Sequence, residues 1–578
     1  MDMMNKKRVM IFIGIGIVGF GMISTLFIFF KPQGQTQIKP NHKPYSHTVM
    51  FDGNHYKIID TILHEHNQPY LSLYDLEEIL DLTVKISKNQ LKITYGENQL
   101  RYKNTKLVNN NKKENETKSY ITKNKTIFIP KEHIEKYLGV KVDYYLDQKT
   151  RTLALMSPNE QQKERYDQHI GTTIFLHKNH MPQEKYEPRN GIYLGGYVLQ
   201  DEHIEMSMST FNQLTGKKHA SYFKYVGYGQ PFPTEWVTDV INKGGFPHIA
   251  WEPNNGLDEV RDDAYLREFA REANKANVPI LLRYASEMNG TWTAYSGDSK
   301  LYIEKWKLVH RIMKEEAPNV MMLWNVFTMP ENSIMDYYPG DEYVDYIGVN
   351  IYNVVYHNDR LDNRSDFEDP LRLLDYVYNT FSHKKPIVIG EFGATNYNVT
   401  DGLYHVDFAI EKISRMYKYI PRLYPRVKFI YYFDVNNLVN APEGRKINNY
   451  AITENPRITD AYAKFVKEKA YLSEVQQDAP SMETFSYRDF LFYFKGDLFV
   501  DIQFIQDYLD MKVEQGGKNI IEVIYDEHQY KIKTEELTID KAAFYEKRVI
   551  TGVPIDELLN AFRINYQYKG ENLHIFAQ

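Results

Sequence analysis

The segment Pro279-Ile-Leu-Leu-Arg-Tyr-Ala-Ser-Glu-Met-Asn-Gly-Thr-Trp292 contains a short apolar run that is followed closely by a carboxylate, Glu287. A second segment, Pro386-Ile-Val-Ile-Gly-Glu-Phe-Gly-Ala394, has the same form and places Glu391 directly after an apolar run. Burial of a carboxylate at the end of such a strand costs free energy unless a partner compensates for it. The two glutamates are therefore the first candidates for functional residues.

These two segments belong to a longer region, from about residue 191 to residue 467, in which apolar strands alternate with amphipathic helices. Eight strands are predicted, at residues 192–197, 222–227, 246–251, 279–284, 320–324, 346–351, 386–389 and 429–433. Helical spacing of apolar residues is clearest at residues 263–273 and 302–313. Eight strands that alternate with helices predict an α/β fold of the (β/α)8 TIM-barrel type, with a doubly wound open sheet as the alternative.

In a (β/α)8 barrel the catalytic groups lie just beyond the carboxyl ends of the strands. Glu287 follows the fourth predicted strand and Glu391 follows the seventh, so both should lie at the same end of the barrel. One strand-terminal glutamate could equally be a salt-bridge partner or a helix cap, but a pair favours function. Hydrolysis of a glycosidic bond needs such a pair, one protonated acid and one carboxylate.

The motifs Arg-x-x-x-Glu-Met-Asn-Gly-x-Trp at residues 283–292 and Gly-Glu-Phe-Gly around Glu391 resemble those of glycoside hydrolase family 26. This β-mannanase-like family belongs to a clan of retaining (β/α)8 hydrolases, and the resemblance covers about half of the chain. It implies that Glu287 is the acid/base and Glu391 the nucleophile. Residues expected to bind or orient the substrate and the carboxylates are Arg283, Asn289, Trp292, Trp251, Trp324, Tyr352 and Tyr432.

The chain also departs from the family pattern. Ser286 stands where family members usually carry a histidine, and Tyr432 with Phe433 stands where a tryptophan platform is common. We therefore expect retained chemistry with altered sugar subsites. Trp251 and Trp324 at other strand ends fit either stacking on a sugar or burial in the barrel wall. His248 and Asp434 could reach the cleft, although lone polar residues near strand ends are usually bonded to backbone.

Two further regions, residues 49–157 and 485–578, share a repeated unit of a short strand, an amphipathic helix and an alternating strand. They resemble the stalk domains named after the amino-terminal domain of copper amine oxidases, and a spacer or wall-proximal binding role is expected. The predicted division is residues 1–31 (stub and anchor), 32–48 (linker), 49–157 (module), 185–470 (barrel) and 485–578 (module). We also expect the two modules to lie side by side or to pack on one flank of the barrel.

The amino terminus predicts a membrane anchor. Lys6, Lys7 and Arg8 precede an uncharged apolar run at residues 9–30, which is long enough to span a bilayer as a helix. The basic flank should stay in the cytoplasm, so the chain beyond Lys31 should be extracellular. A cleaved signal peptide is the rival, but its apolar region is usually shorter.

Composition narrows the class of function. A net charge of -6 and a pI near 6.3 argue against nucleic acid, and the absence of cysteine excludes disulfides and thiolate sites. No metal-binding spacing or phosphate loop occurs, so neither a metal nor a cofactor is expected. The 47 tyrosines fit sugar stacking but also ordinary cores.

Together these features predict a single-pass membrane protein of a Gram-positive bacterium, with an extracellular retaining endo-β-glycanase domain. Its expected partners are a polysaccharide of mannan or β-glucan type, the membrane, and cell-wall or exopolysaccharide machinery, with the cell's own exopolysaccharide as a candidate substrate. Two alternatives stay open. One is a polysaccharide-binding protein on an inactive barrel, and the other is an envelope scaffold in which the flanking modules do the main work.

Overall fold

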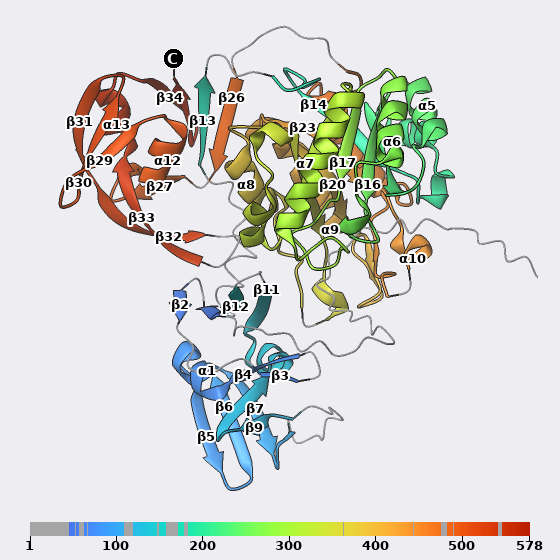
Figure 1. Cartoon of the computed structure of the whole chain (residues 1–578). Helices are drawn as coiled ribbons and strands as arrows, with labels where there is room; N and C mark the ends of the chain where they lie inside the picture. Colours follow the sequence, from blue (N-terminus) through green and yellow to red (C-terminus); the bar gives the residue numbers. More distant parts are fainter. Residues whose placement is uncertain are drawn as a thin grey trace, which may run out of the picture.

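The computed structural model describes residues 46–51, 54–56, 63–65, 68–108, 119–146, 150–157, 172–178, 183–361, 363–442, 444–475, 483–488, 490–541 and 546–577. A central barrel is accompanied by two smaller α+β modules (Figure 1). We call the module drawn in blue, residues 46–157, the N-module. The C-module, drawn mainly in red, comprises residues 172–178 and 483–577.

The barrel consists of eight parallel strands that close into a ring. They are β14 (Ile192–Tyr197), β15 (Ser221–Gly227), β16 (Phe246–Glu252), β17 (Ile280–Tyr284), β18 (Val320–Phe327), β19 (Tyr346–Asn353), β20 (Ile387–Ala394) and β23 (Val427–Phe433). Each strand pairs with the next, and β14 pairs with both β23 and β15. This closure confirms the predicted (β/α)8 barrel and excludes the open sheet.

Helices surround the ring of strands. They are α4 (Met208–Thr215), α5 (Thr234–Asn242), α6 (Ala264–Lys275), α7 (Ser299–Glu316), α8 (Pro370–Phe381), α9 (Val406–Leu423) and α11 (Pro456–Val466). Between β18 and β19 the 3-10 segments η4 (Glu331–Tyr337) and η5 (Asp341–Tyr343) take the place of a helix. Short elements complete the region: η2 (Glu202–Ile204), η3 (Leu257–Glu259), η6 (His357–Asp359), α10 (Asn437–Asn440), β21 (Tyr397–Asn398), β22 (Leu403–Tyr404), β24 (Asn448–Asn449) and β25 (Tyr471–Leu472).

Aromatic side chains fill the inside of the barrel. The rings of Tyr193, Phe246 and Phe429 contact one another with centroids 5.0–5.6 Å apart, and Phe223 and Tyr431 lie in the same cluster. All five are buried. Many of the tyrosines are therefore core residues, and the interior is packed rather than open, as in other barrels of this kind.

Both modules contain the repeated strand–helix–strand unit. The N-module comprises β1 (Ser46–Phe51), β2 (Asn54–Tyr56), β3 (Leu63–Glu65), β4 (Gln68–Ser72), α1 (Leu73–Leu80), β5 (Thr83–Ser87), β6 (Gln90–Tyr95), β7 (Asn98–Lys103), β8 (Lys106–Leu107), β9 (Ile121–Lys123), β10 (Thr126–Pro130), α2 (Lys131–His133), η1 (Ile134–Leu138), β11 (Lys141–Leu146) and β12 (Thr150–Met156). The C-module comprises β13 (Thr173–Lys178), β26 (Glu483–Arg488), β27 (Leu491–Phe494), β28 (Asp497–Asp501), α12 (Ile502–Tyr508), β29 (Lys512–Gly517), β30 (Ile520–Tyr525), β31 (His528–Lys533), β32 (Glu535–Lys541), β33 (Glu546–Pro554), α13 (Ile555–Ala561), β34 (Asn565–Lys569) and β35 (Asn572–Phe576).

The two modules have the same topology. In the N-module, β1 pairs in parallel with the last strand β12 and antiparallel with β2. In the C-module, β13 pairs in parallel with the last strand β35 and antiparallel with β26. Only residues 52–53 separate β1 from β2, whereas residues 179–482, which include the whole barrel, separate β13 from β26. The barrel is thus inserted into the C-module between its first two strands.

The sequence-based division missed this insertion. It assigned residues 173–178 to no domain, because β13 pairs with a strand almost 400 residues away and carries no local sign of that partner. In this sheet β13, which precedes the barrel in the chain, pairs with β26 and β35, which follow it. The sheet thus joins the two parts of the C-module that the barrel separates in the sequence.

A buried ion pair fixes the C-module to the barrel. Arg488 on β26 donates from Nη1 to both carboxylate oxygens of Asp375 on α8, each at 3.0 Å, and both side chains are largely buried. Nearby, the hydroxyl of Ser486 donates to that of Tyr378 at 3.1 Å. Helix α8 is therefore the junction between the barrel and the C-module.

The N-module contacts both other parts. Arg360, in the loop after β19, donates from Nη2 to Oε2 of Glu135 at 2.9 Å. Strand β2 lies against β33 of the C-module (Figure 1). The expected contact between the two modules is thus present at these strands.

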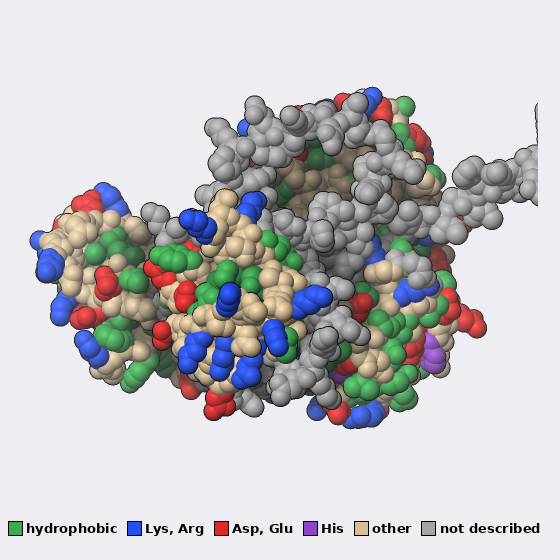
Figure 2. Space-filling view, turned by 90° about the horizontal axis from the view of Figure 1, so that it is seen from below, with side chains coloured by type: hydrophobic (Ala, Val, Ile, Leu, Met, Phe, Trp, Pro, Cys, Tyr) green, Lys and Arg blue, Asp and Glu red, His purple; other side chains and the backbone are tan. Residues whose placement is uncertain are grey.

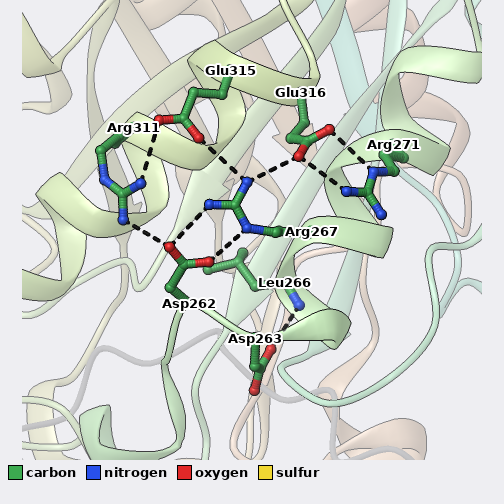
Figure 3. A network of polar contacts seen from close by, with 8 residues as sticks. All are labelled: Asp262, Asp263, Leu266, Arg267, Arg271, Arg311, Glu315 and Glu316. Atoms are coloured by element: carbon green, nitrogen blue, oxygen red, sulfur yellow. Dashed lines mark hydrogen bonds and ion pairs between the residues drawn. The ribbon is translucent and has the colours of Figure 1, made fainter.

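On the outer surface of the barrel, charged side chains connect α6 to α7 (Figure 3). Arg267 donates from Nε to Asp262 at 2.7 Å and from Nη1 to Glu316 at 3.0 Å. Asp263 caps α6 by accepting from the Leu266 amide at 3.0 Å. Single exposed pairs of this kind stabilise a protein by at most about 1 kcal/mol each.

Within the described residues, no helix combines the length and the apolar character needed to span a bilayer. The apolar run at residues 9–30, on which the predicted anchor rests, lies outside the described residues.

The junction yields a test of the inserted architecture. Arg488→Met removes the guanidinium that bonds both oxygens of the buried Asp375 carboxylate, which should lower the free energy of unfolding by ~3–5 kcal/mol. All five tryptophans lie in the barrel, so their fluorescence during denaturant unfolding reports on the barrel rather than on the C-module. The control Arg457→Met removes an exposed pair with Asp407 and should cost less than about 1 kcal/mol. Equal, small effects of both variants would contradict the coupling.

Candidate active site

Polar side chains gather at the carboxyl ends of the barrel strands. Arg283 comes from β17, Asn350 and Tyr352 from β19, and Glu391 from β20, while Glu287 lies in the turn that follows β17. All five side chains are buried. The structure therefore brings together the two predicted catalytic carboxyl groups and two of the residues expected to orient them.

Glu391 accepts hydrogen bonds on both carboxylate oxygens. Arg283 donates from Nη2 to Oε1 at 2.6 Å, the hydroxyl of Tyr225 donates to the same oxygen, and the hydroxyl of Tyr352 donates to Oε2. Burial raises the pKa of both tyrosines, with the charge of Glu391 adding to it, so they remain hydroxyl donors. These two hydroxyl groups and the guanidinium together stabilise a negative charge on the Glu391 carboxylate.

Glu287 has a different environment. Its Oε1 accepts from Asn350 Nδ2 at 2.6 Å and its Oε2 accepts from Trp292 Nε1 at 2.8 Å. Burial, together with the negative charge of Glu391, raises the pKa of Glu287 from 4.5 to about 8. Glu287 thus holds its proton near neutral pH, whereas Glu391 is bonded by the Arg283 guanidinium, which is the division of roles that an acid and a nucleophile need.

Asn350 connects the two carboxyl groups. While its Nδ2 donates to Glu287, its Oδ1 accepts from Arg283 Nη1 at 3.4 Å and from Asn325 Nδ2 at 2.9 Å. Gly390 lies close to the Asn325 side chain: a Cβ atom added to Gly390 would lie 2.2 Å from Asn325 Oδ1. Only glycine fits directly before Glu391, which explains this part of the Gly-Glu-Phe-Gly motif.

The turn that carries Glu287 is held by a third buried carboxyl group, Glu252 at the end of β16. Its oxygens accept from the Ser286 amide at 3.1 Å, the Ser286 hydroxyl at 2.6 Å and the Tyr295 hydroxyl at 2.6 Å. Ala285 and Glu287 have φ values of 46° and 59°, in the left-handed region that non-glycine residues rarely adopt. These hydrogen bonds hold the strained turn, and they give Ser286 a structural role.

Sequence reasoning missed Tyr225, Glu252, Asn325 and Asn350 as members of the site. Glu252 ends an apolar strand in the same way as the two glutamates that were noticed, so the same criterion could have found it. Tyr225 lies within β15 and is no different in sequence from the many core tyrosines.

Three residues predicted to bind the substrate lie elsewhere. Trp251 stacks on Phe269 of α6 with ring centroids 4.1 Å apart, and Trp324 packs edge-on against Phe381 of α8 at 5.6 Å. Tyr432 is also fully buried, and its hydroxyl donates to the Tyr450 carbonyl at 2.9 Å. Successive residues of a strand point to opposite faces, and these three point towards the helices. Their side chains pack between the strands and the surrounding helices and do not line the active site.

Asn289 is also misassigned. Its amide nitrogen donates to the carbonyls of Phe327 at 2.9 Å and Pro330 at 3.2 Å, and its Oδ1 accepts from the Phe327 amide at 2.9 Å. Asn289 therefore joins the loops after β17 and β18. Trp292, by contrast, is half-buried beside Glu287, as expected of a subsite residue.

Two other residues named from the sequence do not reach the carboxyl groups. His248 is buried among barrel rings, 4.5 Å from Tyr431 and 5.1 Å from Phe223 between centroids, and burial holds its pKa well below 6.5. Asp434 accepts from the Ile452 amide at 2.7 Å. The loop after β23 contributes instead Arg445, a half-buried cation that interacts electrostatically with Glu287.

Comparison with known proteins agrees with this geometry. The family model described as glycosyl hydrolase family 26 matches residues 254–419, a range that contains Arg283, Glu287, Tyr352 and Glu391. Residues 254–419 of the barrel are thus similar to glycosyl hydrolase family 26. The chain therefore contains a glycoside hydrolase domain, and the expected resemblance holds for this region.

Individual relatives are more distant. An endoglucanase H from Acetivibrio thermocellus is 26% identical over 225 residues, which cover 36% of this chain and 24% of that protein, so the chain spans about a quarter of the length of this relative. Among solved structures, a family 26 β-mannanase from Bacteroides ovatus is 15% identical with a TM-score of 0.36, covering 49% of this chain and 90% of the other. A modular endo-β-1,4-mannanase from Cellulomonas fimi is 13% identical with a TM-score of 0.38, covering 63% and 88%.

The raised pKa of Glu287 can be tested without a substrate. Its folded-state pKa of about 8 lies above the unfolded value of 4.5, so the folded protein binds the proton more tightly and stability falls as pH rises through this window. Relative to Glu287→Gln, the free energy of unfolding of the wild type should fall by up to about 1.4 kcal/mol per pH unit between pH 5 and 8.

Denaturant unfolding at a series of pH values measures this difference. Glu304→Gln, at a glutamate whose side chain is 71% exposed, is the control and should show no such slope. A difference between wild type and Glu287→Gln that stays constant over this range would contradict a protonated Glu287.

Proposed function

We propose that the chain is a retaining endo-β-glycanase in which Glu391 is the nucleophile and Glu287 the acid/base. The observation that carries the proposal is the difference in hydrogen-bond partners between two buried carboxyl groups. Glu391 is bonded by the Arg283 guanidinium and Glu287 by the neutral Asn350 amide, and Asn350 in turn accepts from Arg283. Protonated Glu287 would donate to the departing glycosidic oxygen while Glu391 attacks the anomeric carbon. Both groups lie at the barrel end where such chemistry occurs.

The same electrostatics support the second half of the cycle. The charge of Glu391 helps to raise the pKa of Glu287, and that charge disappears when Glu391 forms an ester with the sugar. The pKa of Glu287 then falls, so the residue that acted as an acid can accept a proton from water. The pair thus switches roles without a further group, as a double displacement requires.

For the substrate, we propose a β-glycan of mannan or β-glucan type. The similarity of the barrel to family 26 supports this class, and the similarity to a protein named endoglucanase H supports β-glucan within it. Ser286 is small and its side chain is bonded to Glu252. The sugar subsite beside Glu287 should therefore differ from that of family members that carry a histidine at the position of Ser286.

We further propose that the protein is anchored to the outer face of the cell membrane and acts on polymer at its own surface, including the cell's own exopolysaccharide. The support is the apolar run at residues 9–30 with its basic amino-terminal flank, together with flanking modules that resemble stalk domains. Protease added to intact cells should then remove the barrel. Protection of the barrel until the cells are lysed would reverse this orientation.

Substitution of the two glutamates should separate their roles. Glu391→Ala should abolish turnover, because the covalent step is lost. Glu287→Ala should lower kcat/KM on polymer by about 10²–10⁴-fold, because general-acid assistance is lost, and should retain activity on aryl glycosides with good leaving groups.

Azide should rescue Glu287→Ala and yield a β-glycosyl azide, because the small anion replaces the base-activated water. The same assay on Glu391→Ala should give no β-azide. Near wild-type rates in both variants, or inversion of configuration in the first product seen by NMR, would overturn the proposed mechanism.

A further inference from the structure

The central sheet of the N-module carries a row of three cations. Lys85 on β5 lies directly opposite Lys92 on β6, which lies directly opposite Arg101 on β7. Neighbouring strands are about 4.8 Å apart, and like charges placed directly opposite one another destabilise a sheet. A row of this kind therefore works against the stability of the module that carries it.

The row is on the outer face of the sheet. Residues of the opposite face, such as Ile93, Leu100 and Tyr102, are buried in the core of the N-module. Lys85 and Arg101 are exposed and Lys92 is half-exposed. Figure 2, which views the molecule from the side on which the N-module lies, shows basic side chains gathered on this module.

Within the part of the chain that the structure describes, no carboxylate forms an ion pair with any of the three. Arg101 donates instead to the side chain of its neighbour Gln99. On the same face Lys103 lies opposite Lys106 and extends the basic area. Since the whole chain has a net charge of -6, this positive charge is local and not a property of the protein at large.

The C-module shows that the fold does not require the row. At the equivalent positions of its sheet, Glu514 lies opposite Glu522, which lies opposite Lys531. The same topology thus carries a row of three cations in one module and a row with two carboxylates in the other. The basic row belongs to the N-module alone, and it is placed where a partner outside the chain can reach it.

We propose that the row formed by Lys85, Lys92 and Arg101 binds a polysaccharide that carries carboxylate groups. Amine and guanidinium groups bind carboxylates through charge-assisted hydrogen bonds. The outward positions on either side of the row hold Ser87, Gln90, Thr94 and Gln99, whose side chains can bond sugar hydroxyls.

Other polyanions fit this face less well. Its outward positions on β5, β6 and β7 hold only polar residues, and the exposed Ile86 of β5 belongs to the opposite face, so this face offers neither an aromatic platform for nucleic-acid bases nor an apolar group to enter a membrane. The choice of a glycan among polyanions rests on the proposed function of the barrel. Arg445, the cation close to Glu287, suits an acidic sugar at the active site as well.

The test measures binding of fluorescent polygalacturonate to the full-length chain in neutral detergent. The variant Lys85→Gln/Lys92→Gln/Arg101→Gln should bind at least tenfold more weakly than the wild type, and wild-type binding should weaken steeply with added salt. The matched control, Lys512→Gln/Lys531→Gln/Lys533→Gln, removes the same charge from exposed positions of the C-module sheet and should stay within twofold of the wild type.

Equal loss of binding in both triple variants, or unchanged binding in the N-module variant, would overturn the proposal. Competition experiments give a further contradicting outcome. The proposal would be overturned if polyphosphate, DNA or phosphatidylglycerol mixed micelles displaced the fluorescent polymer from the wild type at lower concentrations than unlabelled polygalacturonate does, and if this displacement depended on the basic row. Hydrolysis of a small neutral aryl β-glycoside is measured in parallel and should be the same in all three proteins. Row-dependent binding without any hydrolysis would refute the glycanase proposal while leaving the binding surface intact.

Discussion

The active site depends on one electrostatic constraint: two carboxyl groups are buried at the same end of a barrel, and a cation donates a hydrogen bond to Glu391 but not to Glu287. Arg283 and two tyrosine hydroxyls bond Glu391, whereas Glu287 is left with two neutral donors, Asn350 and Trp292. Burying a second negative charge without such compensation is costly, so Glu287 keeps its proton. The remaining features of the site serve to maintain this difference between the two residues.

The surrounding barrel contributes to the constraint by excluding water and fixing geometry. Aromatic rings fill the barrel interior beneath the site, so the polar groups rest on a packed core that limits their movement. Glu252 holds the left-handed turn that carries Glu287, and the glycine before Glu391 allows Asn325 to approach. A geometry held by neighbours in this way needs little rearrangement during the reaction.

The sequence was sufficient to predict the barrel and to place Glu287 and Glu391 at the same end of it, because each glutamate closely follows an apolar run in the sequence. Sequence-based prediction failed for residues whose role depends on the direction of the side chain or on a partner far away in the chain. Trp251 and Trp324 stand at strand ends like Glu391, but the alternation of the strand turns them towards the helices. Tyr225 and Asn350 became visible only when neighbouring strands were placed beside one another. The insertion of the barrel into the C-module was hidden for the same reason, since β13 pairs with β35 across almost the entire rest of the chain.

The proposed mechanism requires that Glu391 form a covalent bond to the sugar. Incubation with an activated 2-deoxy-2-fluoro-β-glycoside, followed by proteolysis and mass spectrometry, tests it directly, because the fluorine slows breakdown of the intermediate. We expect a single modified peptide with the sugar on Glu391, and no modification in Glu391→Gln. A label on Glu287 or Glu252, or turnover of a good substrate with no label at all, would contradict it.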